Sequence, residues 1–100
     1  MILYVVDLQV DAAVQDDYLR WLRGHVKEMT ALPGFLGADI LERLEPASPA
    51  ERRAYSVHYR LRDRAAFDAY LARHAARMRA QGERFGRQVG ASRGLLQTLE

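Results

Sequence analysis

The chain of 100 residues contains 49% hydrophobic and 28% charged residues, a composition typical of globular proteins. A chain of this length builds one small core, so we expect a single domain over residues 1–100. It has no cysteine, which excludes disulfides and thiolate metal sites. No apolar run is long enough to cross a membrane, and the sequence opens as a strand rather than a signal peptide. We therefore expect a soluble cytoplasmic protein with no membrane partner.

The net charge of +2 conceals an asymmetry between the two halves of the chain. Residues 1–50 carry four basic and eight acidic side chains, whereas residues 51–100 carry eleven basic and five acidic ones. The arginines of the second half are spread out and form no basic stripe interleaved with exposed aromatic residues. They are typical of solvated surfaces, and nucleic acid is not expected as a partner.

The first half of the chain predicts a strand, a helix and a second strand. Residues 2–10 alternate between two faces with a period of two and contain β-branched side chains, which is typical of a strand. Asp11 is placed to cap a helix whose apolar residues recur at helical spacing as far as Leu32, where a Pro-Gly pair ends it. A second strand is expected over residues 35–44.

The second half repeats this pattern. The two prolines of residues 45–51 predict a loop, and residues 53–61 alternate as a third strand. Asp63 is a second capping candidate, followed by one continuous helix that ends near Gly82. Residues from about 89 to 99 supply a final strand.

A repeat without gaps supports this order of elements. Equivalent positions of the two helices carry Tyr18, Trp21, Leu22, His25 and Met29 in the first, and Phe67, Tyr70, Leu71, His74 and Met78 in the second. The order β-α-β-β-α-β with internal pseudo-symmetry is that of the ferredoxin-like fold. We therefore predict an α+β protein in which two helices cover one face of a four-stranded antiparallel sheet.

The opposite face of that sheet needs a partner. It presents Leu3 and Val5 beside a polar cluster of Asp7, His58 and Arg60. A second copy that covers these residues gives a dimeric α+β barrel, so we expect a homodimer. The polar cluster then either fixes the register of the dimer or favours a protonated His58 beside Asp7.

Three segments resemble one known family: MILYVVDLQVD, WLRGHVKEMTALPGF, and the run from YRLRDRAAFDAYLARH to ASRGLL. The members of this family are short bacterial proteins described as a domain of unknown function, and the likeness covers nearly the whole chain. The family is similar to the dimeric α+β barrel superfamily, which includes antibiotic-biosynthesis-type and haem-degrading monooxygenases. The resemblance implies the ferredoxin-like fold and the homodimer, and it implies no catalytic residue.

His25 and His74 are the candidate catalytic residues, because a histidine on the apolar face of a helix can act as general acid or base toward a bound ligand. The alternative is a pair of partly buried histidines that bond to their neighbours. His58 is expected on the other side of the sheet, so no three-histidine metal site is predicted.

In the haem-degrading relatives a histidine of the second helix ligates the haem, and the resemblance places His74 there. Those enzymes also use an Asn and a Trp near the haem. This chain has no asparagine, and Tyr70 is the nearest aromatic residue to His74 in the sequence. The absence of these two residues near His74 argues against haem degradation, and no cofactor is predicted.

Aromatic side chains on the helix-facing side either line a ligand cavity or simply form the core. They are Tyr18, Trp21, Tyr59, Phe67 and Tyr70. The segment from Arg84 to Arg93 has arginines and glycines suited to an anion, but its spacing fits no phosphate loop.

The sequence favours a small homodimeric protein that binds a small organic ligand between helices and sheet. One alternative is a monooxygenase-like enzyme, either cofactor-independent or haem-related. The other is a structural or interaction module without a ligand. A cavity that both helix histidines reach would favour ligand binding or catalysis, and a filled core would exclude both.

Overall fold

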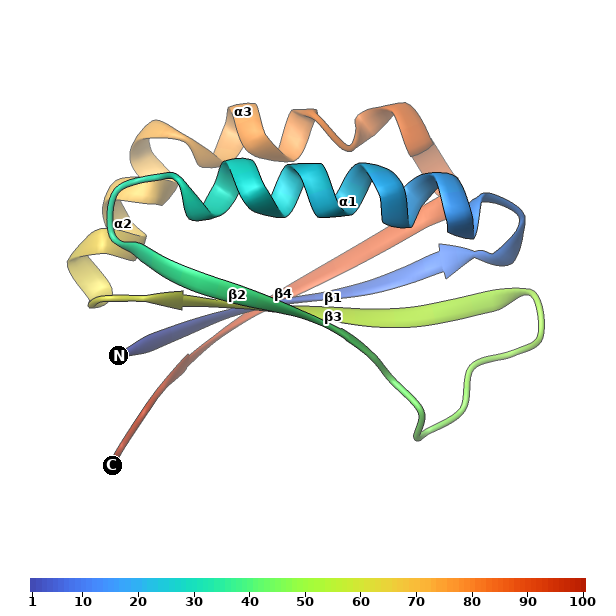
Figure 1. Cartoon of the computed structure of the whole chain (residues 1–100), viewed down its shortest axis with the longest axis horizontal. Coiled ribbons are helices and arrows are strands. Elements are labelled where there is room, and N and C mark those ends of the chain that lie inside the picture. Colours follow the sequence, from blue (N-terminus) through green and yellow to red (C-terminus); the bar gives the residue numbers. More distant parts are fainter.

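The computed structural model describes residues 1–100 as a four-stranded sheet with all its helices on one face (Figure 1). The elements are, in chain order, β1 (Ile2–Asp11), the 3-10 helix η1 (Ala12–Val14), α1 (Gln15–Thr30), β2 (Phe35–Glu42), β3 (Arg52–Leu61), α2 (Arg64–Arg73), α3 (Ala75–Ala80), the 3-10 helix η2 (Glu83–Gln88) and β4 (Val89–Gln97). The strands lie in the order β2-β3-β1-β4, and every neighbouring pair is antiparallel. The predicted α+β ferredoxin-like fold is confirmed.

β1 is a central strand, because β3 and β4 are hydrogen-bonded to its two edges. Tyr4 is in register with Tyr59 of β3, and Val6 is in register with Arg93 of β4. The alternation of β1 separates the two faces of the sheet as predicted. Tyr4 is buried under the helices, whereas Val5 is partly exposed on the far face. The core therefore lies between the sheet and the helices.

Both predicted helix caps are present. The Asp11 side chain accepts a hydrogen bond from the backbone N–H of Ala13 at 3.0 Å, and this cap opens η1, which leads into α1. Asp63 caps α2 in the same way, accepting from the backbone N–H of Ala66 at 2.8 Å. The side chains that α1 buries against the sheet are Tyr18, Leu22, Val26 and Met29.

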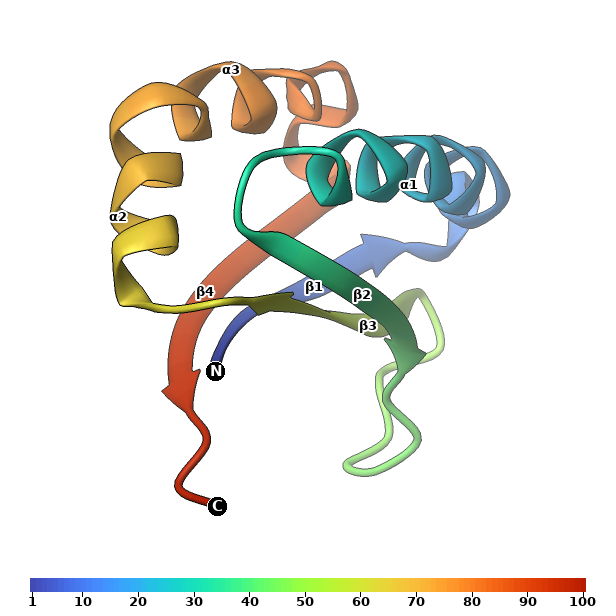
Figure 2. The same ribbon diagram turned by 60° about the vertical axis from the view of Figure 1, so that its left-hand side comes forward.

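The second helical segment is divided, which corrects the expectation of one continuous helix. α2 ends at Arg73 and α3 begins at Ala75, because His74 has the non-helical angles φ −130° and ψ −26°. The chain changes direction at this point (Figure 2). Leu71 of α2, expected on the buried face, is 43% exposed, whereas Met78 beyond the break is buried as expected. Neither glycine nor proline lies at the break, so the sequence gives no local signal for it.

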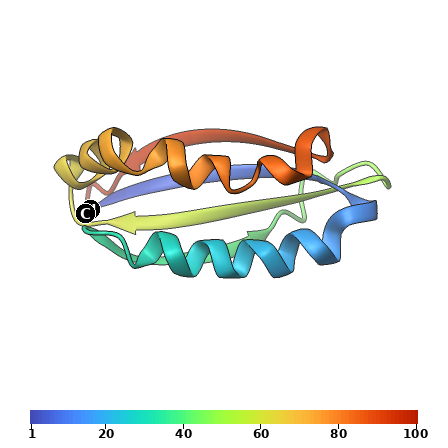
Figure 3. The ribbon, with the colours of Figure 1, turned by 90° about the horizontal axis from the view of Figure 1, so that it is seen from above.

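The connection between α3 and β4 forms η2, which the sequence did not predict. Gly86 within it has a φ of 55°, a conformation that favours glycine. Phe85 beside it is buried and packs on the aromatic residues of α1. Seen from above, α1 and α3 run along opposite sides of the sheet (Figure 3). None of the helices has the length and apolar character needed to span a membrane.

Gly34, in the turn before β2, meets the tightest steric requirement of the fold. Its φ is +85°, and a β-carbon added there would collide with the β-carbon of Ala66 in α2. We predict that Gly34→Ala lowers the free energy of unfolding by about 1–3 kcal/mol, measured by urea denaturation. Gly94→Ala is the matched control, since a β-carbon there meets nothing within 4 Å. An equal loss in both variants would contradict the prediction.

Candidate functional site

A cavity of about 320 Å³ lies between the helices and the sheet. Its floor is the helix-facing side of β1, β3 and β4, and its walls come mainly from α1, α3 and η2. Small residues leave this space open, because Ala91, Gly82 and Gly86 contribute no large side chain to the lining. The aromatic residues that line the cavity are Tyr4, Tyr18, Trp21, Tyr59 and Tyr70.

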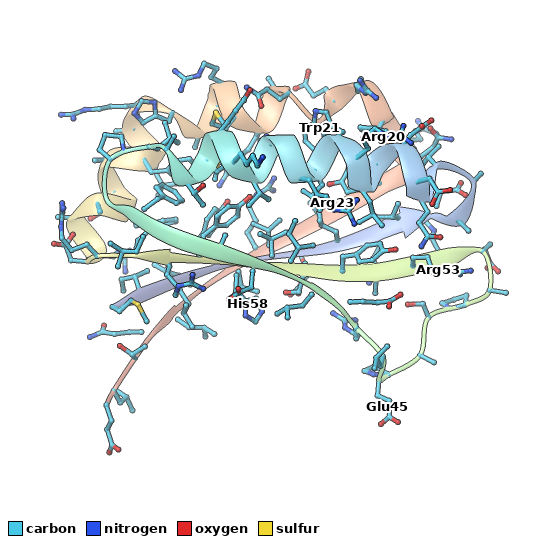
Figure 4. All side chains as sticks on the ribbon, in the orientation of Figure 1. Arg20, Trp21, Arg23, Glu45, Arg53 and His58 are labelled. Carbon is cyan, nitrogen blue, oxygen red and sulfur yellow. The ribbon has the colours of Figure 1, made fainter.

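Trp21 forms one wall of the cavity, on the helical side of the sheet (Figure 4). Its ring stacks on the ring of His25, with centroids 4.7 Å apart and an interplanar angle of 18°. Phe85 of η2 meets Tyr18 edge-on at a centroid distance of 4.9 Å and Trp21 at 5.7 Å. These ring contacts fix the orientation of the wall.

His25 is the helix histidine that reaches the cavity. Its Nδ1 lies 2.9 Å from Oε1 of Gln81, the residue that follows α3. Because an amide oxygen only accepts hydrogen bonds, Nδ1 is the donor and carries a hydrogen. Nε2 is then left as the nitrogen that can accept a hydrogen bond or a proton from a ligand. The role of His25 as general acid or base stays a prediction.

Tyrosine rings form much of the cavity floor. Tyr4 packs on Tyr59 and Tyr70, with centroid separations of 5.7 and 5.8 Å. The Tyr4 hydroxyl accepts a hydrogen bond from Nη2 of Arg79 at 3.2 Å. Burial raises the pKa of Tyr18 and of Tyr70 to about 12, and it also raises the pKa of Tyr59. These three phenols are therefore protonated at neutral pH and can donate hydrogen bonds.

Two predicted site residues lie outside the cavity lining. Phe67 packs on Tyr4 with ring centroids 5.1 Å apart, in the core beside the cavity. His74 occupies the break between α2 and α3, and its Nδ1 lies 3.0 Å from Nη2 of Arg77. The other five predicted site residues do line one cavity. They are Tyr18, Trp21, His25, Tyr59 and Tyr70.

A haem held by His74 does not fit this geometry, because His74 contacts Arg77 and does not line the cavity. The residues present do not form the haem site that the resemblance implies. Nor does the chain bring three or more His, Asp or Glu side chains close enough together to hold a metal ion.

Asp7, His58 and Arg60 all lie on the far face of the sheet, away from the helices. Oδ1 of Asp7 is 3.9 Å from Nη2 of Arg43, and Nη1 of Arg60 donates to Oδ2 of Asp39 at 2.6 Å. His58 is in register with Asp39 and points away from the helices (Figure 4). The three residues therefore share a face, but Asp7 and Arg60 pair with side chains that sequence reasoning did not select.

The site residues predicted from the sequence did not include Tyr4, Arg79, Gln81 or Phe85. Tyr4 was recoverable, because strand alternation places it on the helix-facing side beside other aromatic residues. Arg79 lies near the end of α3, Gln81 follows that helix, and Phe85 lies in η2. Their positions depend on the break at His74 and on a glycine with positive φ, and the sequence pattern predicts neither.

The model of the family described as Domain of unknown function (DUF4286) matches residues 1–99. The chain belongs to this family. The DUF4286 match includes every residue that lines the cavity. Among curated proteins, none matches the sequence significantly.

Solved structures similar to this DUF4286 chain share its fold over almost the whole length. The haem degrader MhuD from Mycobacterium tuberculosis, with two haems bound in its active site, has a TM-score of 0.70 and 23% identity over 100% of this chain and 97% of its own. A protein from Deinococcus radiodurans assigned as an antibiotic biosynthesis monooxygenase has a TM-score of 0.75 and 14% identity, covering 100% and 94%. A dimeric ferredoxin-like protein from an uncultured marine organism has a TM-score of 0.74 and 13% identity, covering 99% and 95%. At these identities the likeness establishes the fold alone.

The tyrosines of the cavity predict a loss of stability at alkaline pH. The raised pKa values of Tyr18 and Tyr70, about 12 against an ordinary 10.0, mean that the unfolded chain loses these protons first. The folded state then holds more protons, so the free energy of unfolding is unaffected by these groups below pH 10 and falls between about pH 10 and 12. Urea denaturation across this range should give a shallower fall for Tyr18→Phe and Tyr70→Phe than for the wild type. If the free energy of unfolding fell equally steeply with pH in all three proteins, these phenols would not be the cause of the fall.

Proposed function

We propose that this chain binds a small organic ligand in the cavity between its helices and its sheet. The observation that carries the proposal is a space of about 320 Å³ with an apolar, aromatic lining and a few polar groups. Small-molecule sites typically occupy roughly 300–1,000 Å³ and have this kind of lining. The volume and the lining of this space therefore both fit a small-molecule site.

The chemistry of the lining supports a ligand with a flat ring. Trp21 and Tyr18 present aromatic surface from α1, and Tyr59 presents it from the sheet. His25 adds one polar nitrogen on the same side as Trp21, held in place by Gln81 at 2.9 Å. MhuD, a protein with the same fold, holds two haems in its active site, which supports a ligand-binding role for this architecture.

Native mass spectrometry of the freshly purified protein tests this proposal. We expect the wild type to retain added mass from a bound ligand. Ala91→Trp should lose that mass, because residue 91 is an exposed alanine of the lining and an indole there fills the cavity. Ala72→Trp is the matched control, since Ala72 is exposed on α2 and lies outside the lining. A wild type with the mass of the bare chain would contradict the proposal.

We also propose that the chain forms a homodimer through the far face of its sheet. Leu41 and Leu96 lie on this face and are 42% and 57% exposed. The loop between β2 and β3 and the C-terminus both extend on the same side (Figure 2), and they carry Leu44 and Leu99, which are 76% and 94% exposed. A monomer would leave these leucines in water, whereas a two-fold partner covers them with the same surface.

Light scattering at micromolar concentration tests the dimer. We expect twice the chain mass for the wild type and the single mass for Leu96→Lys, because two-fold symmetry places two unpaired ammonium groups in one interface. Leu71→Lys is the matched control, since Leu71 is a leucine of similar exposure, at 43%, on the helical side. A wild type with the monomer mass, or an equal response of the two variants, would contradict this interface.

A further inference from the structure

The apolar cavity contains a group of phenol hydroxyls with few protein partners. Tyr18 and Tyr59 are 4% and 2% exposed, and the protein offers neither hydroxyl a hydrogen-bond partner. No side-chain oxygen or nitrogen that is sealed from solvent lacks a partner in this structure. The two hydroxyls are therefore accessible from the cavity that both residues line. Unpartnered polar atoms at this depth are costly unless a ligand or water meets them.

Two guanidinium groups reach the same space without an acidic partner. Arg93 is on the helix-facing side of β4, in register with Val6, and Arg79 is in α3, which forms part of the cavity wall. Neither is among the chain's five ion pairs, which involve other arginines. Glu83 is the only acidic residue of the lining, and its side chain is not paired with either arginine within 4.0 Å.

The positive charge of Arg93 affects the pKa values of the phenols that line the cavity. Arg93 itself is exposed. Burial has the larger effect and raises the pKa values of Tyr18, Tyr59 and Tyr70, whereas the charge of Arg93 lowers them. Arg93, Tyr18 and Tyr59 all line the same cavity, so one ligand can reach all three. Arg79 already donates to the Tyr4 hydroxyl at 3.2 Å, which leaves Arg93 as the cation with no partner.

The groups that meet in this part of the cavity are donors. A guanidinium has no acceptor atom, and a neutral phenol offers its O–H. Their complement is an acceptor, and a charged acceptor forms hydrogen bonds roughly twice as strong as a neutral one. The surrounding rings require that the rest of the ligand be apolar and flat.

We propose that the ligand is an aromatic carboxylate whose acidic group meets Arg93 and the hydroxyls of Tyr18 and Tyr59. Its ring then packs against the aromatic lining, with the ring near Trp21. This inference rests on the proposed ligand-binding function and adds the chemical class of the ligand to it.

Isothermal titration calorimetry with 2-naphthoate and its neutral isostere 2-naphthamide tests the proposal. We expect the wild type to bind the carboxylate about tenfold more tightly or better, the difference typical of one charged hydrogen bond. Arg93→Gln should bind both compounds with nearly equal affinity, and Arg93→Lys should restore part of the preference. Arg73→Gln is the matched control, since Arg73 is an exposed arginine of α2 outside the lining, and it should keep the full preference. Circular dichroism checks that each variant is folded.

The outcomes separate this inference from the proposed function. Equal binding of both compounds by the wild type overturns the carboxylate assignment and leaves the cavity as a ligand site. A preference that survives in Arg93→Gln overturns the role of Arg93. If the wild type binds neither compound, the inference fails. Added mass in the native spectrum would then show that the proposed function still stands, and its absence would mean that both fail.

Discussion

The buried phenol hydroxyls impose the constraint on which the rest of this structure depends. A tyrosine ring contributes a large apolar surface to a core, but its hydroxyl must meet a polar partner or water. Two hydroxyls are satisfied within the protein, since Gln15 donates to Tyr55 at 2.7 Å and Arg79 donates to Tyr4 at 3.2 Å. The hydroxyls of Tyr18 and Tyr59 have no such partner, and both residues line the cavity between the helices and the sheet. The polar atoms of the core and the cavity therefore belong together.

The two halves of this pseudo-symmetric chain are not equivalent. In the first half α1 is continuous, and His25 turns toward the cavity with Gln81 as its partner. In the second half the helix breaks at His74, and this histidine contacts Arg77 instead. The break directs the chain across the sheet and brings η2 against Trp21. The first half supplies α1 as one wall of the cavity, and the second half supplies η2, which packs against that wall.

The sheet divides the chemistry of the molecule into two regions. Its helix-facing side combines aromatic rings with unpaired arginines, which suits a ligand of mixed character. Its far side combines exposed leucines with ion pairs such as Arg60–Asp39 at 2.6 Å, which suits a surface that meets a copy of itself. The central strand β1 belongs to both regions, since its alternate residues face opposite ways.

The sequence by itself determined the order of the strands and main helical segments, the two aspartate caps, and the faces of β1 and β3. These features depend on short-range periodicity and on the hydrogen bonding of single residues such as Asp11 and Asp63, which any helix or strand obeys. Tertiary structure alone decided the break at His74, the path of η2 and the partners of His25. These features depend on which distant segments pack together over a twisted sheet, and local sequence patterns do not predict such contacts. Most aromatic residues of the site were therefore predictable, whereas Arg79 and Gln81 were placed by the fold.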